Sequence, residues 1–295
     1  MGNVRSSIKE LTPDKIFKPQ ARCASVSEDN SNLANSSSKN DLSELDDVLV
    51  HILSFMSVED LIFNCRFVCK EWKEIIDGNG LWKIKCKREN RCIPSAILNP
   101  IPQHYYRKIY IFNPFGRNLV YNPCGKDQFD GWMLRSIDDG DGFKVEDPPQ
   151  GSDPVPKEVG SQSCFVTSYE WCIKCQLVDL IRRGVPKEIL KLETTKVEVG
   201  EWYAARSDCA AEYKLDVSLL FLQRAIDPPK PPHDVFDHTD TIKQGKGKQW
   251  HKVSHTFQNL GESRCVCFQH SAKDLEKKKG HYGMKMTGSY VKVIA

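Results

Sequence analysis

Residues 45–82 carry three short amphipathic helical patterns in close succession. Apolar residues of the first pattern recur at the spacing of one helix face, and they are Val48, Leu49, Ile52, Leu53 and Met56. Ser57 stands three residues before Asp60, an N-cap pattern that predicts a second helix from Val58. A third apolar stripe ends at the turn-forming residues 77–80, and it comprises Phe67, Val68, Trp72, Ile75 and Ile76.

Three helices of this length cannot bury a self-sufficient core. Some of their apolar residues must therefore cover another surface, which is either the rest of the chain or a docking partner. Beyond them, residues 81–89 read as a short basic helix and residues 89–115 as a linker. Prolines punctuate that linker at Pro94, Pro100, Pro102 and Pro114.

Residues 1–41 are largely polar, so we expect a disordered tail that cannot bury enough apolar surface to fold alone. The chain begins Met1-Gly2-Asn3-Val4-Arg5-Ser6, which matches a myristoylation pattern and makes Gly2 a candidate lipidation site. An ordinary tail without a lipid is the alternative. One acyl chain anchors only marginally, so the expected membrane association is weak.

From residue 116 onward apolar residues tend to recur at every second position instead of at helical spacing. Tyr213, Leu215, Val217 and Leu219 alternate with polar residues, which predicts a half-buried strand. Between residues 165 and 177 one parity holds the apolar residues Phe165, Tyr169, Trp171, Ile173, Cys175 and Leu177. Further short strands are predicted at 196–199, 265–268 and 290–293, with glycine and proline turns between strands. This pattern favours an antiparallel β-sandwich or barrel.

The helical stretch resembles an F-box, the motif that binds the Skp adaptor of the SCF (Skp, cullin, F-box) ubiquitin ligase. The resemblance runs from Leu45 to Lys83 and is carried by Leu45-x-x-x-Leu-x-x-Ile-Leu-Ser-Phe55, Asp60-Leu61, Arg66-x-Val-Cys-Lys-x-Trp72 and Leu81-Trp-Lys83. It implies that the residues most suited to meet the adaptor are Leu45, Val48, Leu49, Ile52, Leu53, Leu61, Val68, Cys69 and Trp72. Some of these will instead hold the helices together, and the sequence does not say which.

The C-terminal half resembles the F-box-associated domain of the sugar-binding F-box proteins. The matching motifs, in order, are Asn118-Leu-x-x-Asn-Pro-Cys-Gly125, Gly131-Trp132, Ser168-Tyr-Glu-Trp-Cys172, Val178-Asp-Leu180, Glu201-Trp-Tyr-x-x-Arg-Ser-Asp208, Ser254-His-Thr-Phe257, Phe268-x-His270 and Gly280-x-Tyr-Gly283. Together the two resemblances imply an α+β multidomain fold. A three-helix F-box (42–88) would precede the linker and a jelly-roll-like antiparallel β-sandwich (116–295).

Several members of that family bind the inner core of N-linked glycans, with an aromatic pair in the loop before the residue that matches Gly280. This sequence carries Lys277, Lys278 and Lys279 there, while Tyr169 keeps an upstream ring. An ammonium group offers hydrogen-bond donors but no flat apolar face for a sugar. The candidate residues for binding a substrate protein, which we call a client, are therefore Tyr169, Lys277, Lys278 and Lys279. The segment 273–285 holds five lysines against Asp274 and Glu276, so its formal charge is +3, and we call it the lysine loop. This loop suits an acidic or phosphorylated ligand, or it is simply solvated and clients bind elsewhere on the sandwich.

Composition excludes several other function classes. The formal net charge is only +3, so we expect no nucleic-acid partner. The twelve cysteines are scattered through a chain without a secretory leader or a membrane-length apolar stretch, so reduced thiols are expected. Cys172 and Cys175 lack a second pair at zinc-ligand spacing, and no nucleophile or phosphate-loop signature is present. We expect no catalytic residue, metal or cofactor.

These observations predict a non-enzymatic substrate-recognition subunit of an SCF ubiquitin ligase, whose partners are the Skp adaptor, the cullin scaffold and protein clients. One hypothesis is that the clients are misfolded N-glycoproteins in endoplasmic-reticulum-associated degradation. A second is that they are unglycosylated or acidic proteins. A third is a membrane-tethered interaction protein without a ligase role. The expected location is the cytoplasm, including the periphery of the endoplasmic reticulum or other membranes.

Overall fold

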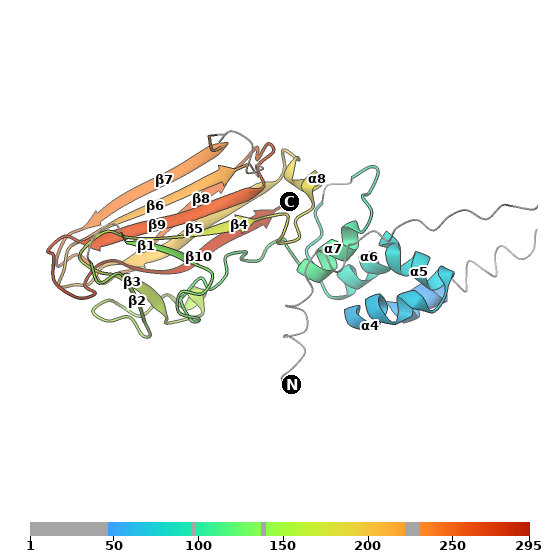
Figure 1. The fold of residues 1–295 in the computed structure, drawn as a ribbon, viewed down its shortest axis with the longest axis horizontal. Coiled ribbons are helices and arrows are strands. Elements are labelled where there is room, and N and C mark those ends of the chain that lie inside the picture. The colour runs from blue at the N-terminus through green and yellow to red at the C-terminus, as the bar shows by residue number, and fades with distance from the viewer. Residues whose placement is uncertain (1–46, 96–97, 137–139, 222–230) are drawn as a thin grey trace, which may run out of the picture. The chain divides into compact units, whose positions relative to one another are not determined.

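The computed structural model describes residues 47–95, 98–136, 140–221 and 231–295. It divides into a helical unit, which includes residues 101–111, and a β unit, which comprises residues 92–100 and 112–295. Figure 1 shows both, with the helices of the helical unit in blue to green and the strands of the β unit in green to red. The confirmed fold class is thus a helical module and a domain of two antiparallel sheets.

Each helix of the helical unit is short. The elements are the helical residues 47–53, α4 (Val58–Phe63), the 3-10 turn η1 (Cys65–Phe67), α5 (Lys70–Asp77), α6 (Asn79–Arg88) and α7 (Tyr105–Phe112). The predicted start of the second helix is confirmed, because the Ser57 hydroxyl accepts a hydrogen bond from the Asp60 backbone N–H at 3.0 Å. The third stripe is divided, since Phe67 lies in η1 and the α-helix begins only at Lys70.

The core of the helical unit is small and largely apolar. Its fully buried side chains are Leu53, Leu61, Ile76, Leu81, Trp82, Cys86 and Ile109. The Trp82 indole N–H donates to the Ile76 carbonyl at 2.7 Å, so even the polar end of this large ring is satisfied. Ile109 comes from α7, which lies inside the predicted linker and supplies the core with apolar surface that the first three helices lack.

Among its described residues the β unit contains two five-stranded sheets, in which neighbouring strands are antiparallel. One sheet has the order β1 (Met133–Ser136), β4 (Cys172–Asp179), β9 (Cys265–Asp274), β6 (Ala211–Leu220) and β7 (Asp234–Ile242). The other has the order β2 (Phe143–Glu146), β3 (Cys164–Thr167), β10 (Lys285–Ile294), β5 (Lys196–Ala204) and β8 (His251–Phe257). The short elements η2 (Lys157–Val159) and α8 (Lys187–Leu190) lie in connections.

The predicted alternation is confirmed in β6, where burial alternates along the whole strand. The predicted alternation between residues 165 and 177 does not run through one strand. The chain leaves β3 at Thr167 and begins β4, which belongs to the other sheet, at Cys172. In β4 Lys174 and Val178 are fully buried, whereas Leu177 is 49% exposed. Apolar alternation therefore gave the wrong inward face for this strand.

A polar cluster lies between the two sheets. The Glu201 carboxylate of β5 accepts hydrogen bonds from the Tyr213 hydroxyl at 2.5 Å and the Ser289 hydroxyl at 2.8 Å, and it contacts His270 Nδ1 at 2.8 Å. All four side chains are buried. Burial opposes ionisation of Glu201, but the imidazole of His270 and the hydrogen bonds hold the pKa of this carboxyl below its usual range. The cluster ties β5 and β10 to β6 and β9 through one acceptor.

Lys174 lies in the same interior without a hydrogen-bond partner among the described residues. Its ammonium nitrogen is 3.2 Å from the ring centroid of Trp132 and 3.4 Å from that of Phe165. Desolvation lowers the pKa of this amine well below its ordinary value. Two aromatic rings thus stand where a buried lysine normally has a polar partner.

Candidate functional site

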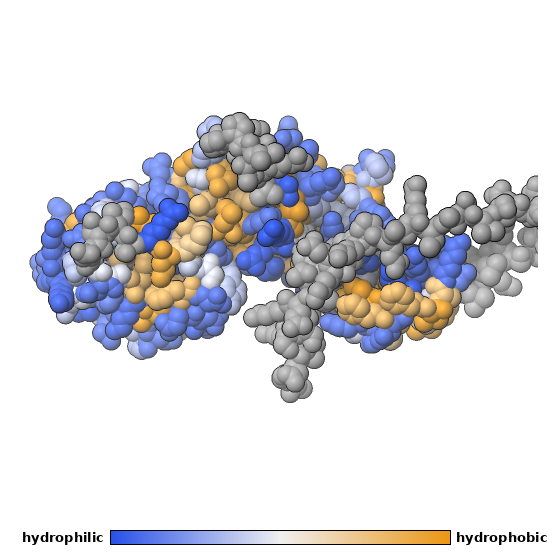
Figure 2. Space-filling view, in the orientation of Figure 1, coloured by the Kyte–Doolittle hydropathy of each residue, from blue (hydrophilic) through white to orange (hydrophobic). Residues whose placement is uncertain are grey.

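Six large apolar side chains of the helical unit are more than half exposed, and we call them the apolar set: Val48, Ile52, Phe55, Phe63, Phe67 and Val68. The first three stand at i, i+4 and i+7, so they share one side of the first helix and its closing turn. Figure 2 shows an apolar band along the side of the helical unit where α4 lies. Exposed apolar residues gathered in this way are typical of an interaction surface.

The structure places the predicted adaptor-binding residues in different environments. Leu45 lies outside the described residues. Val48, Ile52, Val68 and Cys69 are exposed, and Leu49 and Trp72 are half-buried. Leu53 and Leu61 have at most 1% of their surface exposed. These two leucines hold the helices together, which is the division of roles that the sequence left open.

Sequence reasoning did not assign Phe55, Phe63 and Phe67 to the docking surface. Phe67 was placed in the stripe of the third helix, but the 3-10 geometry of η1 turns it outward. Phe63 belongs to none of the predicted apolar stripes, although its spacing of four residues from Phe67 is about one helical turn. A large aromatic residue that fits no stripe was the available signal for a surface role.

One buried and one exposed cation fix the backbone under the apolar set. The Lys85 ammonium group, buried in α6, donates to the carbonyls of Ser54 and Met56 at 3.1 and 2.8 Å. The Arg88 guanidinium donates to the Ser54 carbonyl at 2.7 Å and lies 3.8 Å from the centroid of the Phe55 ring. Because these carbonyls close the first helix, both cations also offset its C-terminal dipole.

A second candidate site lies in the β unit, where three loops meet. The Leu275 N–H donates to the Ala210 carbonyl at 2.9 Å, and the Asp274 N–H donates to the Ser168 carbonyl at 3.1 Å. Backbone bonds thus join the loops around 168–171, 205–210 and 275–283. The structure therefore brings Tyr169 and the predicted lysine loop together, as a shared client site requires.

Most lysines of the segment 273–285 are paired with carboxylates. Contacts of 2.5–3.8 Å join Lys273 to Glu212, Lys277 to Glu170, Lys278 to Glu276 and Lys285 to Glu146. Lys278 also donates to the Asp208 carbonyl at 2.7 Å. Of the five lysines, only Lys279 has no ion pair among the described residues. The positive charge counted from the sequence is largely neutralised locally, which weakens the acidic-ligand interpretation of this loop.

An aromatic ring that sequence reasoning did not select stands in the same loop. Tyr282 is half-buried, and the Arg206 guanidinium lies 4.7 Å from its ring centroid. Arg206 is held by a two-pronged contact with Asp208 at 2.9 and 3.1 Å. The Tyr282 ring centroid lies 6.0 Å from Lys278 Nζ, and Tyr169 stands in the adjoining loop. Aromatic rings with polar groups nearby are the combination that sugars require.

Other expectations concern metal ligands and the chain's start. Within the described ranges, no group of three or more histidine, cysteine or carboxylate side chains is arranged to hold a metal ion. None of the described helices is both long and apolar enough to cross a bilayer. The lipidation candidate Gly2 lies outside the described residues.

Family comparisons match both units. The F-box domain model matches residues 43–84, and the model described as F-box associated region matches residues 110–293. F-box only protein 17 of Homo sapiens is 34% identical over 84% of this chain and 90% of its own length. F-box only protein 27 of Mus musculus is 34% identical over 85% and 90%, and F-box only protein 44 of Homo sapiens is 34% identical over 84% and 94%.

Among solved structures, that of TmCBM61 in complex with beta-1,4-galactotriose is similar with a TM-score of 0.36 and 13% identity, over 60% of this chain and 98% of that chain. The two domain matches and the identity to curated relatives along most of the sequence together assign the family. This chain belongs to the F-box only proteins that carry an F-box-associated domain.

Proposed function

We propose that this protein is the substrate-recognition subunit of an SCF-type ubiquitin ligase. In this proposal the F-box, residues 42–88, docks on the Skp adaptor and the sandwich, residues 116–295, holds a client protein. Residues 89–115 connect them, and their helix α7 packs in the helical unit. Membership in the F-box only proteins supports this role. The observation that carries the proposal is the apolar set, because six exposed apolar side chains on so small a unit require a covering partner.

The proposed mechanism needs no reacting group in this chain. The cullin scaffold holds a ubiquitin-charged conjugating enzyme, and this subunit holds the client near it. Proximity then converts a bimolecular encounter into a nearly intramolecular transfer to a client lysine. The contribution of this chain is the position of the client and the lifetime of its complex.

We infer that the three-loop site in the β unit is where clients bind, and that N-linked glycans are the first ligand class to test. The rings of Tyr169 and Tyr282 support this inference, because sugar C–H faces pack on aromatic rings. Glu170 and Asp208 lie in the same loops and can accept hydrogen bonds from sugar hydroxyls. Clients would then include misfolded glycoproteins in endoplasmic-reticulum-associated degradation, with unglycosylated clients as the alternative.

The adaptor interaction is tested by co-expressing the full chain with the Skp adaptor and measuring the adaptor that co-purifies. Val68→Asp and Ile52→Asp should each reduce affinity on the order of 30-fold or more, because an interface centre does not tolerate an unpaired carboxylate. Val235→Asp is the matched control, since Val235 is 49% exposed on β7 in the other unit. Adaptor retention by both F-box variants at the wild-type level would refute the docking surface.

The glycan inference is tested by calorimetric titration of the adaptor-bound full chain with the chitobiose core of an N-glycan. Binding that is lost in Tyr169→Ala and Tyr282→Ala would support a sugar site built on these rings. The double variant Lys277→Tyr, Lys278→Trp introduces the aromatic pair expected from the family resemblance. If only this variant binds, the native loop is not a glycan site and the clients are recognised by other determinants.

Weak membrane association through a myristoyl group on Gly2 remains part of the proposal, supported by the pattern Met1-Gly2-x-x-x-Ser6. The intact mass of the N-terminal peptide, after expression in a eukaryotic cell, decides it. A peptide with the mass of the unmodified sequence would remove the membrane-tethered alternative.

A further inference from the structure

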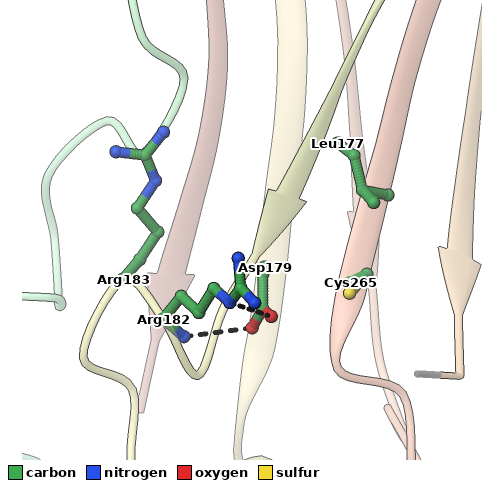
Figure 3. Close-up of a pocket in the computed structure, with 5 residues that line it drawn as sticks. All are labelled: Leu177, Asp179, Arg182, Arg183 and Cys265. Atoms are coloured by element: carbon green, nitrogen blue, oxygen red, sulfur yellow. Dashed lines mark hydrogen bonds and ion pairs between the residues drawn. The ribbon is translucent and has the colours of Figure 1, made fainter. Parts of the chain in front are cut away.

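A cavity of about 390 Å³ lies at the far end of β4 from Tyr169, and it is lined by Leu177, Asp179, Arg182, Arg183 and Cys265. β4 is eight residues long, so this cavity and the three-loop site are separated by on the order of 25 Å of strand. Figure 3 shows Arg182 and Asp179 interacting with each other, while the Arg183 side chain extends away from this pair. The two neighbouring arginines therefore have different environments.

Arg182 is the satisfied member of the pair. Its guanidinium Nε lies 3.6 Å from the Asp179 carboxylate, and its backbone N–H donates to the same side chain at 3.0 Å. The Arg183 guanidinium is half-buried and has neither a hydrogen bond nor an ion pair with any residue that the structure describes. Its burial lowers the pKa of this arginine, and no carboxylate compensates for it.

Two more arginines increase the local positive charge. Arg117 donates to the Asn113 and Asn118 carbonyls at 2.7 and 3.3 Å, and burial together with the charge of Arg183 lowers its pKa. Arg264 precedes the lining residue Cys265, and its Nε is buried without a described partner. Arg182 pairs with Asp179, while Arg183, Arg117 and Arg264 add positive charge near this end of β4. Burying a guanidinium beside other positive charges destabilises the fold unless an anion binds next to it.

The chemistry of the cavity selects a particular kind of anion. A guanidinium presents a planar set of donors that matches the oxygens of a phosphate group. Leu177 supplies an exposed apolar wall, and the strand register places Met133, which is 55% exposed, on the same face one step away. A ligand that matches both features carries a phosphate next to an apolar group.

We propose that the cavity between Arg182 and Arg183 binds the phosphorylated serine or threonine of a client segment, with a neighbouring apolar side chain of that segment on Leu177. The proposal rests on the function proposed above, because it supplies a client determinant for the same subunit. It makes client capture dependent on phosphorylation of the client, at a site separate from the loops around Tyr169.

The test uses the full chain with its adaptor, immobilised at physiological salt. Two pools of nine-residue peptides with mixed flanks are compared, one with a fixed central phosphoserine and one with serine, and retained peptides are counted by mass spectrometry. We expect the phosphoserine pool to be retained at least about tenfold better, since each charged hydrogen-bond pair contributes roughly a factor of ten or more.

Arg183→Gln should lower this retention about tenfold, and Arg183→Lys should restore only part of it, because an ammonium lacks the planar donor fork. Lys187→Gln is the charge-matched control, since its side chain is 76% exposed nearby in sequence and should change retention less than about twofold. Equal retention of the two pools, or full retention by Arg183→Gln, would overturn the proposal.

Failure of the proposed ligase function and failure of the proposed phosphoserine site can be distinguished. If the wild-type chain does not bind the adaptor, the proposed function fails, whatever the peptides do. If the adaptor binds and the phosphoserine pool is not enriched, only the arginine cavity loses its assignment. Unchanged chitobiose titration in Arg183→Gln further separates this cavity from the three-loop site.

Discussion

Arg66 and Asp77 form a two-pronged ion pair in which Nε and an amino nitrogen of the arginine each lie 2.8 Å from a different carboxylate oxygen. Arg66 belongs to η1, and Asp77 is the last residue of α5. The buried Arg107 of α7 approaches the same carboxylate at 3.4 Å. This pair fastens the 3-10 turn to the helix that follows it, and thereby holds Phe67 and Val68 at the surface.

The first prediction concerns Asp77→Asn. The substitution removes the charge opposite Arg66 and Arg107, so the free energy of unfolding should fall by about 1–3 kcal/mol at pH 7. Adaptor affinity should fall with it, because Phe67 and Val68 lose their support. Urea denaturation and adaptor titration measure the two effects, and wild-type values in both would show that the ion pair does not support the surface.

The same variant has a defined pH dependence. Burial opposes ionisation of Asp77, but the hydrogen bonds and charge of Arg66 and the charge of Arg107 lower its pKa below the ordinary value. A carboxyl with a lowered folded-state pKa stabilises the fold above its unfolded pKa near 4, and this contribution is lost as the pH falls through the folded value. The stability gap between wild type and Asp77→Asn should therefore narrow in acid.

The second prediction uses adjacent residues with opposite burial. Leu53→Ala removes a core side chain and should lower the free energy of unfolding by about 2–5 kcal/mol. Ile52→Ala removes a side chain that is 54% exposed, so stability should change by less than about 0.5 kcal/mol while adaptor affinity falls. Denaturation and adaptor titration of both variants check the division; a strongly destabilised Ile52→Ala would place this residue in the core instead.

The third prediction compares two fully buried lysines. Lys285 is paired with Glu146 at 2.5 Å, whereas Lys174 has only ring contacts. Lys285→Met should destabilise by about 3–5 kcal/mol because it strands a buried carboxylate. Lys174→Met should stabilise by about 1–3 kcal/mol because it removes a buried donor without a hydrogen bond. Denaturation at pH 7 measures both, and destabilisation by Lys174→Met would show that the ring contacts outweigh desolvation.

The pH dependence of the Lys174 effect has a definite sign. Desolvation places the folded-state pKa of this amine well below its unfolded value near 10.4. The unfolded chain therefore binds more protons between those two values, and stability rises with pH across that range. This rise should be smaller in Lys174→Met, which can be measured by denaturation at several alkaline pH values.

Local patterns predicted much of the fold because local chemistry determines it. The Ser57 cap and the burial alternation of β6 depend on neighbours in sequence, and both predictions are confirmed. Lys174 could not be predicted, because its inward position depends on Trp132 and Phe165, which come from distant segments. Likewise, no periodicity separates exposed Ile52 from buried Leu53, since helices that come later in the chain cover only one of them.

The candidate client residues show the same limit. Counting charges along residues 273–285 predicted a cationic loop, but Glu170, Glu212 and Glu146 reach these lysines from other strands and loops. Tyr282 and the arginine cavity at the end of β4 could be recognised only from the fold. In the structure Arg206 lies beside Tyr282, and Arg117 lies near Arg183 of the cavity.

The fourth prediction tests the central claim, that the exposed face of the F-box docks on the adaptor. Cys69 borders Val68 on this face, and Cys92 is an exposed thiol in the other unit. Most other described cysteines are buried; desolvation raises the pKa of Cys86 and of Cys164 to about 12, so these thiols should react slowly.

The measurement is the alkylation rate of Cys69 and Cys92, read by mass spectrometry of their peptides, with and without saturating Skp adaptor. We expect the adaptor to slow alkylation of Cys69 on the order of tenfold or more, in proportion to the fraction bound, and to leave the rate at Cys92 unchanged. Equal Cys69 rates in the free chain and in the chain saturated with adaptor would contradict it.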